Sequence, residues 1–61
     1  MTISIEEQIA CAHREIGMRK RVYPRWVENK RMTQAKADAE IAAMEAIKAT
    51  LETVAQSQRL I

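Results

Sequence analysis

The sequence predicts an all-α protein, a helical hairpin with a proline-kinked first arm, assembled as a dimeric four-helix bundle or a coiled-coil-like oligomer. Three observations support this fold class. Residues 34–58 contain no glycine and no proline, Ser4 opens a second segment with helical apolar spacing, and a proline and a basic turn separate the two. We expect residues 1–61 to form a single domain, with helices over residues 5–22, 24–30 and 34–57.

The longest predicted helix, residues 34–57, is rich in alanine and therefore has high helix propensity. Thr33 is suited to cap it, because its hydroxyl can accept a hydrogen bond from the backbone amide of Lys36. At 100° per residue one arc of the helix is apolar, and Leu51 lies near its centre. Glu40 falls within this arc, so we expect its carboxylate at the rim or paired with an arginine. The members of the arc are Ala37, Ile41, Met44, Ile47, Leu51, Val54 and Ala55.

The opposite side of this helix carries small residues at helical spacing, and two interpretations remain open for it. Alanine is the best helix former and fills exposed positions, or these residues allow a second helix to approach closely. The residues concerned are Ala39, Ala42, Ala46, Ala49 and Thr53.

The first arm begins with a capping box, in which Ser4 is followed three residues later by Glu7. An apolar stripe follows at Ile5, Ile9, Ala12, Ile16 and Tyr23. Pro24 cannot donate a helical hydrogen bond and clashes with the preceding turn, so it kinks the helix or starts a new one. Val27 would continue the stripe if the helix ran through with only a kink; we expect a break at Tyr23–Pro24. The hairpin turn is predicted over residues 29–32, with Asn29 or Lys30 in the left-handed conformation.

A chain of 61 residues buries too little surface to be stabilised easily by itself. Cys11 is the only cysteine and His13 the only histidine, which excludes a disulfide framework and a zinc set. Self-association remains, so we expect a homo-oligomer, a dimer or higher. The predicted core and oligomer contacts are Ile9, Ile16, Ile41, Met44, Ile47, Leu51 and Val54.

The sequence also argues against several functional classes. It has no apolar run of transmembrane length and no signal-peptide pattern at its start, so we expect a cytoplasmic protein without membrane contact. Cys11 and His13 are two positions apart, which directs them to different sides of a helix. A two-helix protein offers no pocket for them, so we predict no catalytic residues, no metal, no cofactor and no enzymatic activity.

The net charge of +2 conceals a strongly basic segment. Residues 14–31 hold seven basic and two acidic residues, a net charge of +5. The segment fits a solvated helix end paired with acids of the second helix, a contact for an acidic protein surface, or a phosphate contact with DNA or RNA. Its two aromatic residues either cover the end of the hairpin or anchor a partner. The candidate partner-binding residues are Arg14, Arg21, Tyr23, Arg25, Trp26, Lys30 and Arg31.

Residues 18–41 also contain a recognisable pattern, in which Met18, Arg19 and the segment VYPRWV (22–27) precede a basic turn and the helix start MTQAKADAEI (32–41). The pattern resembles a group of short proteins predicted from bacteriophage and prophage genomes, over about the C-terminal two-thirds of the chain. Similar proteins often have glycine near position 30, where this chain has Lys30. The resemblance implies a phage or prophage origin and carries no established biochemical activity.

We therefore expect a non-enzymatic phage accessory protein that binds and modulates a host or phage protein in the host cytoplasm. The alternatives are a small nucleic-acid-binding hairpin that uses the basic segment and a structural protein that self-assembles into a larger particle.

Overall fold

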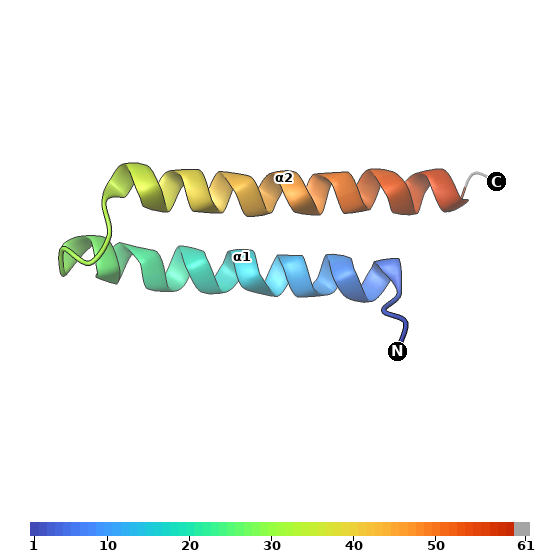
Figure 1. Cartoon of the computed structure of the whole chain (residues 1–61), viewed down its shortest axis with the longest axis horizontal. Coiled ribbons are helices and arrows are strands. Elements are labelled where there is room, and N and C mark those ends of the chain that lie inside the picture. Colours follow the sequence, from blue (N-terminus) through green and yellow to red (C-terminus); the bar gives the residue numbers. More distant parts are fainter. Residues whose placement is uncertain (60–61) are drawn as a thin grey trace.

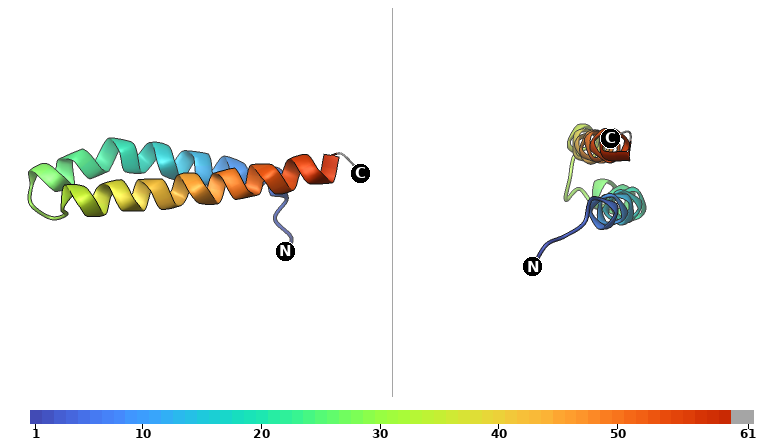
Figure 2. Two further views of the ribbon diagram at one scale, coloured as in Figure 1. Left: turned by 90° about the horizontal axis from the view of Figure 1, so that it is seen from above. Right: turned by 90° about the vertical axis from the view of Figure 1, so that its right-hand side faces the viewer.

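The computed structural model describes residues 1–59, which form two antiparallel helices packed side by side as a hairpin (Figure 1). Helix α1 spans Ile5–Glu28 and helix α2 spans Gln34–Arg59. The predicted all-α helical hairpin is therefore confirmed. The molecule measures 48 × 22 × 16 Å, a single layer of two helices (Figure 2). The last two positions of the predicted 1–61 unit lie outside the described residues.

Both helices begin with the predicted caps. The Ser4 hydroxyl accepts a hydrogen bond of 3.1 Å from the backbone amide of Glu7. The Thr33 hydroxyl accepts one of the same length from the backbone amide of Lys36. Each cap satisfies an amide that has no partner in a preceding turn, so the caps fix where the helices start.

The expected helix break at Tyr23–Pro24 is wrong. Helix α1 continues through Pro24 to Glu28, so the predicted helices 5–22 and 24–30 are one helix. The apolar stripe explains this continuity: Ile16 and Tyr23 are buried against α2 and Val27 is half-buried. Packing of one unbroken stripe offsets the missing amide of proline. Seen from above, α1 is bowed whereas α2 is nearly straight (Figure 2).

The connection between the helices is a Schellman turn. The amide of Arg31 donates to the Trp26 carbonyl at 2.8 Å, and the amide of Lys30 donates to the Val27 carbonyl at 3.1 Å. Lys30 has a φ of 60°, the left-handed conformation predicted for Asn29 or Lys30. Glycine is the usual residue at this position because it has no Cβ to clash with the backbone, so lysine here carries some strain.

The core is thin and lies along the helix–helix seam. Buried residues are Ala12, Ile16 and Tyr23 from α1 and Ala37 and Ala55 from α2. Of the other predicted core residues, Ile9, Ile41, Met44 and Leu51 are half-buried. Ile47 remains 50% exposed and Val54 41% exposed. The apolar arc of α2 is wider than the strip that one neighbouring helix can cover, so part of it faces solvent.

Candidate partner-binding surface at the turn end

Trp26 is the most prominent apolar side chain near the turn, with 38% of its surface exposed. Its ring stacks on that of Tyr23, with the ring centroids 5.5 Å apart and the planes inclined by 29°. Tyr23 is itself buried, and the Arg19 guanidinium carbon lies 5.9 Å from its ring centroid. The stacking holds the indole in place while one part of it faces solvent. Tyr23 therefore packs between α2 and Trp26, and little of its own side chain is accessible to a partner.

A charged cluster anchors this aromatic pair to α2. Arg19 donates to the Glu15 carboxylate and to the backbone carbonyl of Glu40, both at 2.9 Å, and its guanidinium lies 3.5 Å from the Glu40 carboxylate. Lys36 reaches the same carboxylate at 2.8 Å. The expected pairing of Glu40 with an arginine is thus confirmed.

The cluster also shifts the ionisation of its members. The hydrogen bond and charge of Lys36, with a smaller contribution from Arg19, lower the pKa of Glu40 below its ordinary value. The hydrogen bond that Arg19 donates to the Glu15 carboxylate raises the pKa of Arg19. Both shifts favour the charged forms of Arg19 and Glu40, and the formal charges of the two basic and two acidic residues of the cluster cancel.

The basic segment divides into paired and unpaired residues. Arg19 is held as described, and Lys20 reaches the Glu45 carboxylate of α2 at 3.0 Å. No carboxylate in residues 1–59 lies within ion-pair distance of the other five basic residues of the segment. All five are exposed; they are Arg14, Arg21, Arg25, Lys30 and Arg31.

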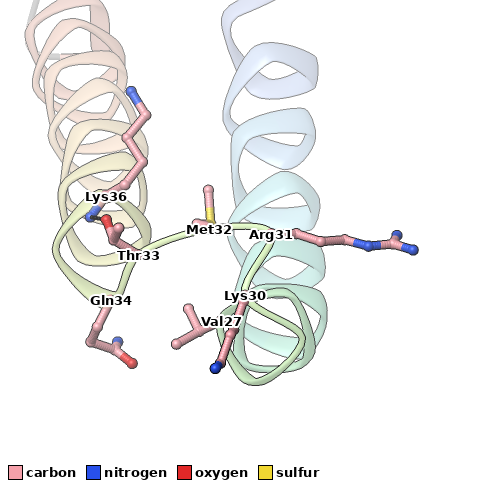
Figure 3. A pocket seen from close by; sticks show the side chains of 7 residues that line it. All are labelled: Val27, Lys30, Arg31, Met32, Thr33, Gln34 and Lys36. Carbon is pink, nitrogen blue, oxygen red and sulfur yellow. Dashed lines mark hydrogen bonds between the residues drawn. The ribbon is translucent and has the colours of Figure 1, made fainter.

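The unpaired residues form two groups. Arg14, Arg21 and Arg25 are spaced by seven and four residues, which places them on one side of α1, facing away from α2. Lys30 and Arg31 lie on the turn, beside an open hollow of about 550 Å³ lined also by Val27, Met32 and Gln34. Figure 3 shows that the side chains of Lys30 and Arg31 point in different directions, so they do not converge on one point. The five residues therefore form two separate basic patches, one on the outer side of α1 and one on the turn.

Cys11 and His13 lie in different grooves of the hairpin. Cys11 lines a hollow together with Ile47 and Leu51, and His13 lines one together with Lys20 and Glu45. They therefore do not approach each other. Within the described part of the chain, no three His, Cys, Asp or Glu side chains gather as a metal site would require. None of the helices there has both the length and the apolar character needed to cross a membrane.

One feature of the surface was not predicted from the sequence. Ile3 and Cys11 of the N-terminal region join Met44, Ile47 and Leu51 of α2 in a hollow of about 430 Å³ at the open end of the hairpin. The predicted apolar arc of α2 included three of its lining residues, Met44, Ile47 and Leu51. The contribution of Ile3 and Cys11 depends on how the helices are aligned, which the separate helical patterns do not give.

Comparisons of the chain with protein-family models, with curated proteins and with solved structures give no match.

Proposed function

We propose that this chain is a non-enzymatic protein that acts by binding another protein through the turn end of its hairpin. The observation that carries the proposal is the half-exposed Trp26, stacked on buried Tyr23 and next to the unpaired Arg25. Tryptophan and arginine dominate the binding energy of protein interfaces, particularly where the aromatic ring is already fixed before binding. The unpaired basic residues favour a partner with an acidic surface.

The sequence resemblance supports a more specific setting for this activity. Short phage proteins of this kind commonly act on host factors, so the proposed partner is a host or phage protein in the cytoplasm of the infected cell. The contact residues fit a partner that has an acidic surface with a recess for an indole ring.

We also propose that the hairpin works as a dimer, in the form of a four-helix bundle. Support comes from the thin core: only five residues of the described chain are buried, and three of them are alanines. Such a small amount of buried apolar surface barely offsets the conformational entropy lost on folding. A second hairpin would bury the apolar side chains that one hairpin leaves exposed.

A second candidate function, nucleic-acid binding, is favoured by a different observation. Arg14, Arg21 and Arg25 lie unpaired on one side of α1, as phosphate-contacting residues do. This candidate does not need Trp26, so the two functions predict different effects of mutation. A third, structural candidate predicts assemblies larger than a dimer and no separate partner.

The test is a pull-down from bacterial lysate with the tagged protein, run with and without nuclease and at low and high salt. The variants are Trp26→Ala and the double substitution Arg14→Ala/Arg21→Ala. Protein binding predicts a partner that survives nuclease and high salt, is lost with Trp26→Ala and is retained by the double variant. Circular dichroism verifies that both variants remain helical.

The opposite pattern would replace the leading proposal. Retention that disappears with nuclease, weakens steeply with salt and is lost with Arg14→Ala/Arg21→Ala establishes nucleic-acid binding, since each phosphate contact releases condensed counterions and so makes the affinity salt-dependent. A partner that binds equally well to Trp26→Ala contradicts the assigned contact surface.

A further inference from the structure

The hairpin has two grooves between its helices, and they differ in chemistry. One groove is bordered by charged side chains, with Lys20 and Glu45 bridging the helices at 3.0 Å and Lys48 pairing with Glu52 at 3.5 Å. The other groove has one charged lining residue, Glu15, which is already bound by Arg19. We call this second groove the apolar groove; it is lined mainly by Ile3, Cys11, Ala12, Met44, Ile47 and Leu51.

Exposed apolar side chains extend the apolar groove along α2. Ile47 is 50% exposed and Val54, two helical turns further on, is 41% exposed. Ile3, which also lines the groove, is 43% exposed. These side chains give the open half of the hairpin an apolar surface on this side: Ile3 and Ile47 line the groove, and Val54 follows Ile47 on the same side of α2. A surface of this kind on so small a chain indicates a contact with another macromolecule.

The hairpin exposes more surface than a compact monomer of its mass would, and this excess leaves room for contact with a second copy of the chain. The accessible surface of the hairpin is 4840 Å². A compact monomer of its mass would expose only about 4000 Å² according to the usual scaling of surface with mass. The difference of about 800 Å² is similar in size to the area that each partner buries in an interface of standard size. The radius of gyration of 14.3 Å also shows an elongated molecule, because a compact chain of this length would have about 10.5 Å.

Charge explains why this surface suits a second copy of the same chain. In a two-fold dimer the same surface meets itself, so it must not carry a net charge. The apolar groove meets this condition, because Glu15 at its border is paired with Arg19. The side of α1 with Arg14, Arg21 and Arg25 fails it, because three unpaired cations would face three more.

We propose that two copies of the chain pair through their apolar grooves in an antiparallel arrangement, with the two turns at opposite ends of the dimer. The inference rests on the proposed dimer and specifies its contact surface and orientation. Glu28 lies about 26 Å from Cys11 along the axis of α1, since each residue rises about 1.5 Å. Antiparallel pairing centred on the groove thus separates the two basic turns by about 50 Å, several Debye lengths at physiological salt.

Parallel pairing would instead place two segments of charge +5 side by side. The antiparallel dimer avoids this repulsion and leaves the turn ends uncovered. Trp26 and its basic neighbours then remain accessible at both ends of the assembly, so one dimer offers two identical surfaces to the partner protein.

The first test compares two double variants that add the same charge to the same helix. Ile47→Glu/Val54→Glu places two carboxylates on the apolar surface, whereas Ala42→Glu/Ala49→Glu places them at exposed positions on the far side of α2. In sedimentation equilibrium we expect the wild type and the alanine-site variant to be dimers. We expect the first variant to show a dissociation constant raised at least about 100-fold, which corresponds to about 2.7 kcal/mol.

Each of the other possible results contradicts a different part of the proposal. A wild type that stays monomeric up to about 100 μM rejects the dimer together with this inference, and leaves the binding of a partner through Trp26 to its own test. A dimer disrupted by the alanine-site variant and not by Ile47→Glu/Val54→Glu keeps the dimer and moves its contact to the small-residue side of α2. Helical content measured by circular dichroism identifies a variant that fails to fold.

The second test measures orientation and needs only one conservative change in the groove, Cys11→Ser. Arg31→Cys in a Cys11→Ser background allows one spin label at each turn. Electron-electron resonance should give a distance of about 50 Å between the labels, from the helical rise. A distance below about 30 Å would show parallel pairing and contradict the proposal.

Discussion

The contacts between the two helices differ between the half of the hairpin near the turn and the half near its open end. In the half near the turn, Arg19 and Lys20 of α1 reach Glu40 and Glu45 of α2, and Tyr23 is buried between the helices. In the open half, beyond Ile16 near the middle of the seam, the buried residues Ala12 and Ala55 are small. Within residues 1–59 no hydrogen bond or ion pair joins the two helices there.

The polar contacts near the turn and the apolar contacts near the open end have different structural effects. Directed polar contacts fix the alignment of the helices near the turn, because a hydrogen bond is satisfied in only one register. Apolar contacts in the open half have no direction, and there they leave Ile47 and Val54 exposed. The turn half is therefore complete within one chain, whereas the open half has surface left for a second one.

The largest effect is expected for Leu51→Asp in the open half. Leu51 is half-buried and lines the apolar groove, so a carboxylate there removes apolar contacts and loses part of its own hydration. We expect a loss of about 3 kcal/mol or more, enough to unfold so small a protein. Urea denaturation followed by circular dichroism measures it. Ala49→Asp, an exposed position two residues earlier, should cost less than about 1 kcal/mol, and an equal loss would contradict the role of Leu51.

A smaller effect is expected for Arg19→Met in the turn half. This substitution keeps the apolar stem of the side chain and removes its hydrogen bonds to Glu15 and Glu40. We expect a loss of about 1.5–3 kcal/mol, as for other hydrogen bonds to charged groups. Lys48→Met is the matched control, because the ion pair of Lys48 with Glu52 lies within α2, and its loss should cost less than about 0.5 kcal/mol. Similar losses for both variants would show that polar contacts between helices do not distinguish the two halves.

The smallest effect, with the opposite sign, is expected for Lys30→Gly. Lys30 has a φ of 60°, which glycine adopts without steric cost. The gain is reduced by the greater freedom of glycine in the unfolded chain, so we expect stabilisation of about 0.5 kcal/mol. Thermal and urea unfolding measure it, with Asn29→Gly as the control, since Asn29 has a φ of −84° and should gain nothing. Destabilisation by Lys30→Gly would mean that the lysine side chain itself supports the turn.

Much of the fold followed from local patterns. Ser4 and Thr33 were identified as caps from their side chains and spacing alone, and Lys30 was one of two residues predicted to be left-handed. These features depend on neighbours within four residues, so the sequence displays them directly. The long alanine-rich helix was equally evident, and within the described residues it extends to Arg59, two residues beyond the prediction.

The error at Pro24 has a different origin. Locally, proline interrupts a helix, because it lacks the amide that would donate the hydrogen bond and its ring clashes with the preceding turn. Ile16, Tyr23 and Val27 form one stripe only when the helix is continuous, and that stripe gains by packing against α2. A contact between residues far apart in the sequence therefore outweighed a local preference.

Of the candidate surface, the sequence indicated the residues and not their arrangement. It placed five cations and both aromatic residues in one segment, and it put Tyr23, but not Trp26, on the apolar stripe. How Trp26 is held depends on the stacking of its ring on that of Tyr23, which the stripe does not give. The pairing of Arg19 and Lys20 with acids of α2 likewise depends on the alignment of the helices.

The sequence by itself determined that this protein is helical, where its helices start and turn, and which faces are apolar or basic. Those properties arise from hydrogen bonds and side-chain periodicity within a few residues. Only the tertiary structure decided that α1 is continuous, that Arg19 joins Glu40, and that one groove closes with ion pairs while the other stays apolar. Each of these depends on the register between two helices, which is set by the sum of many contacts across the seam.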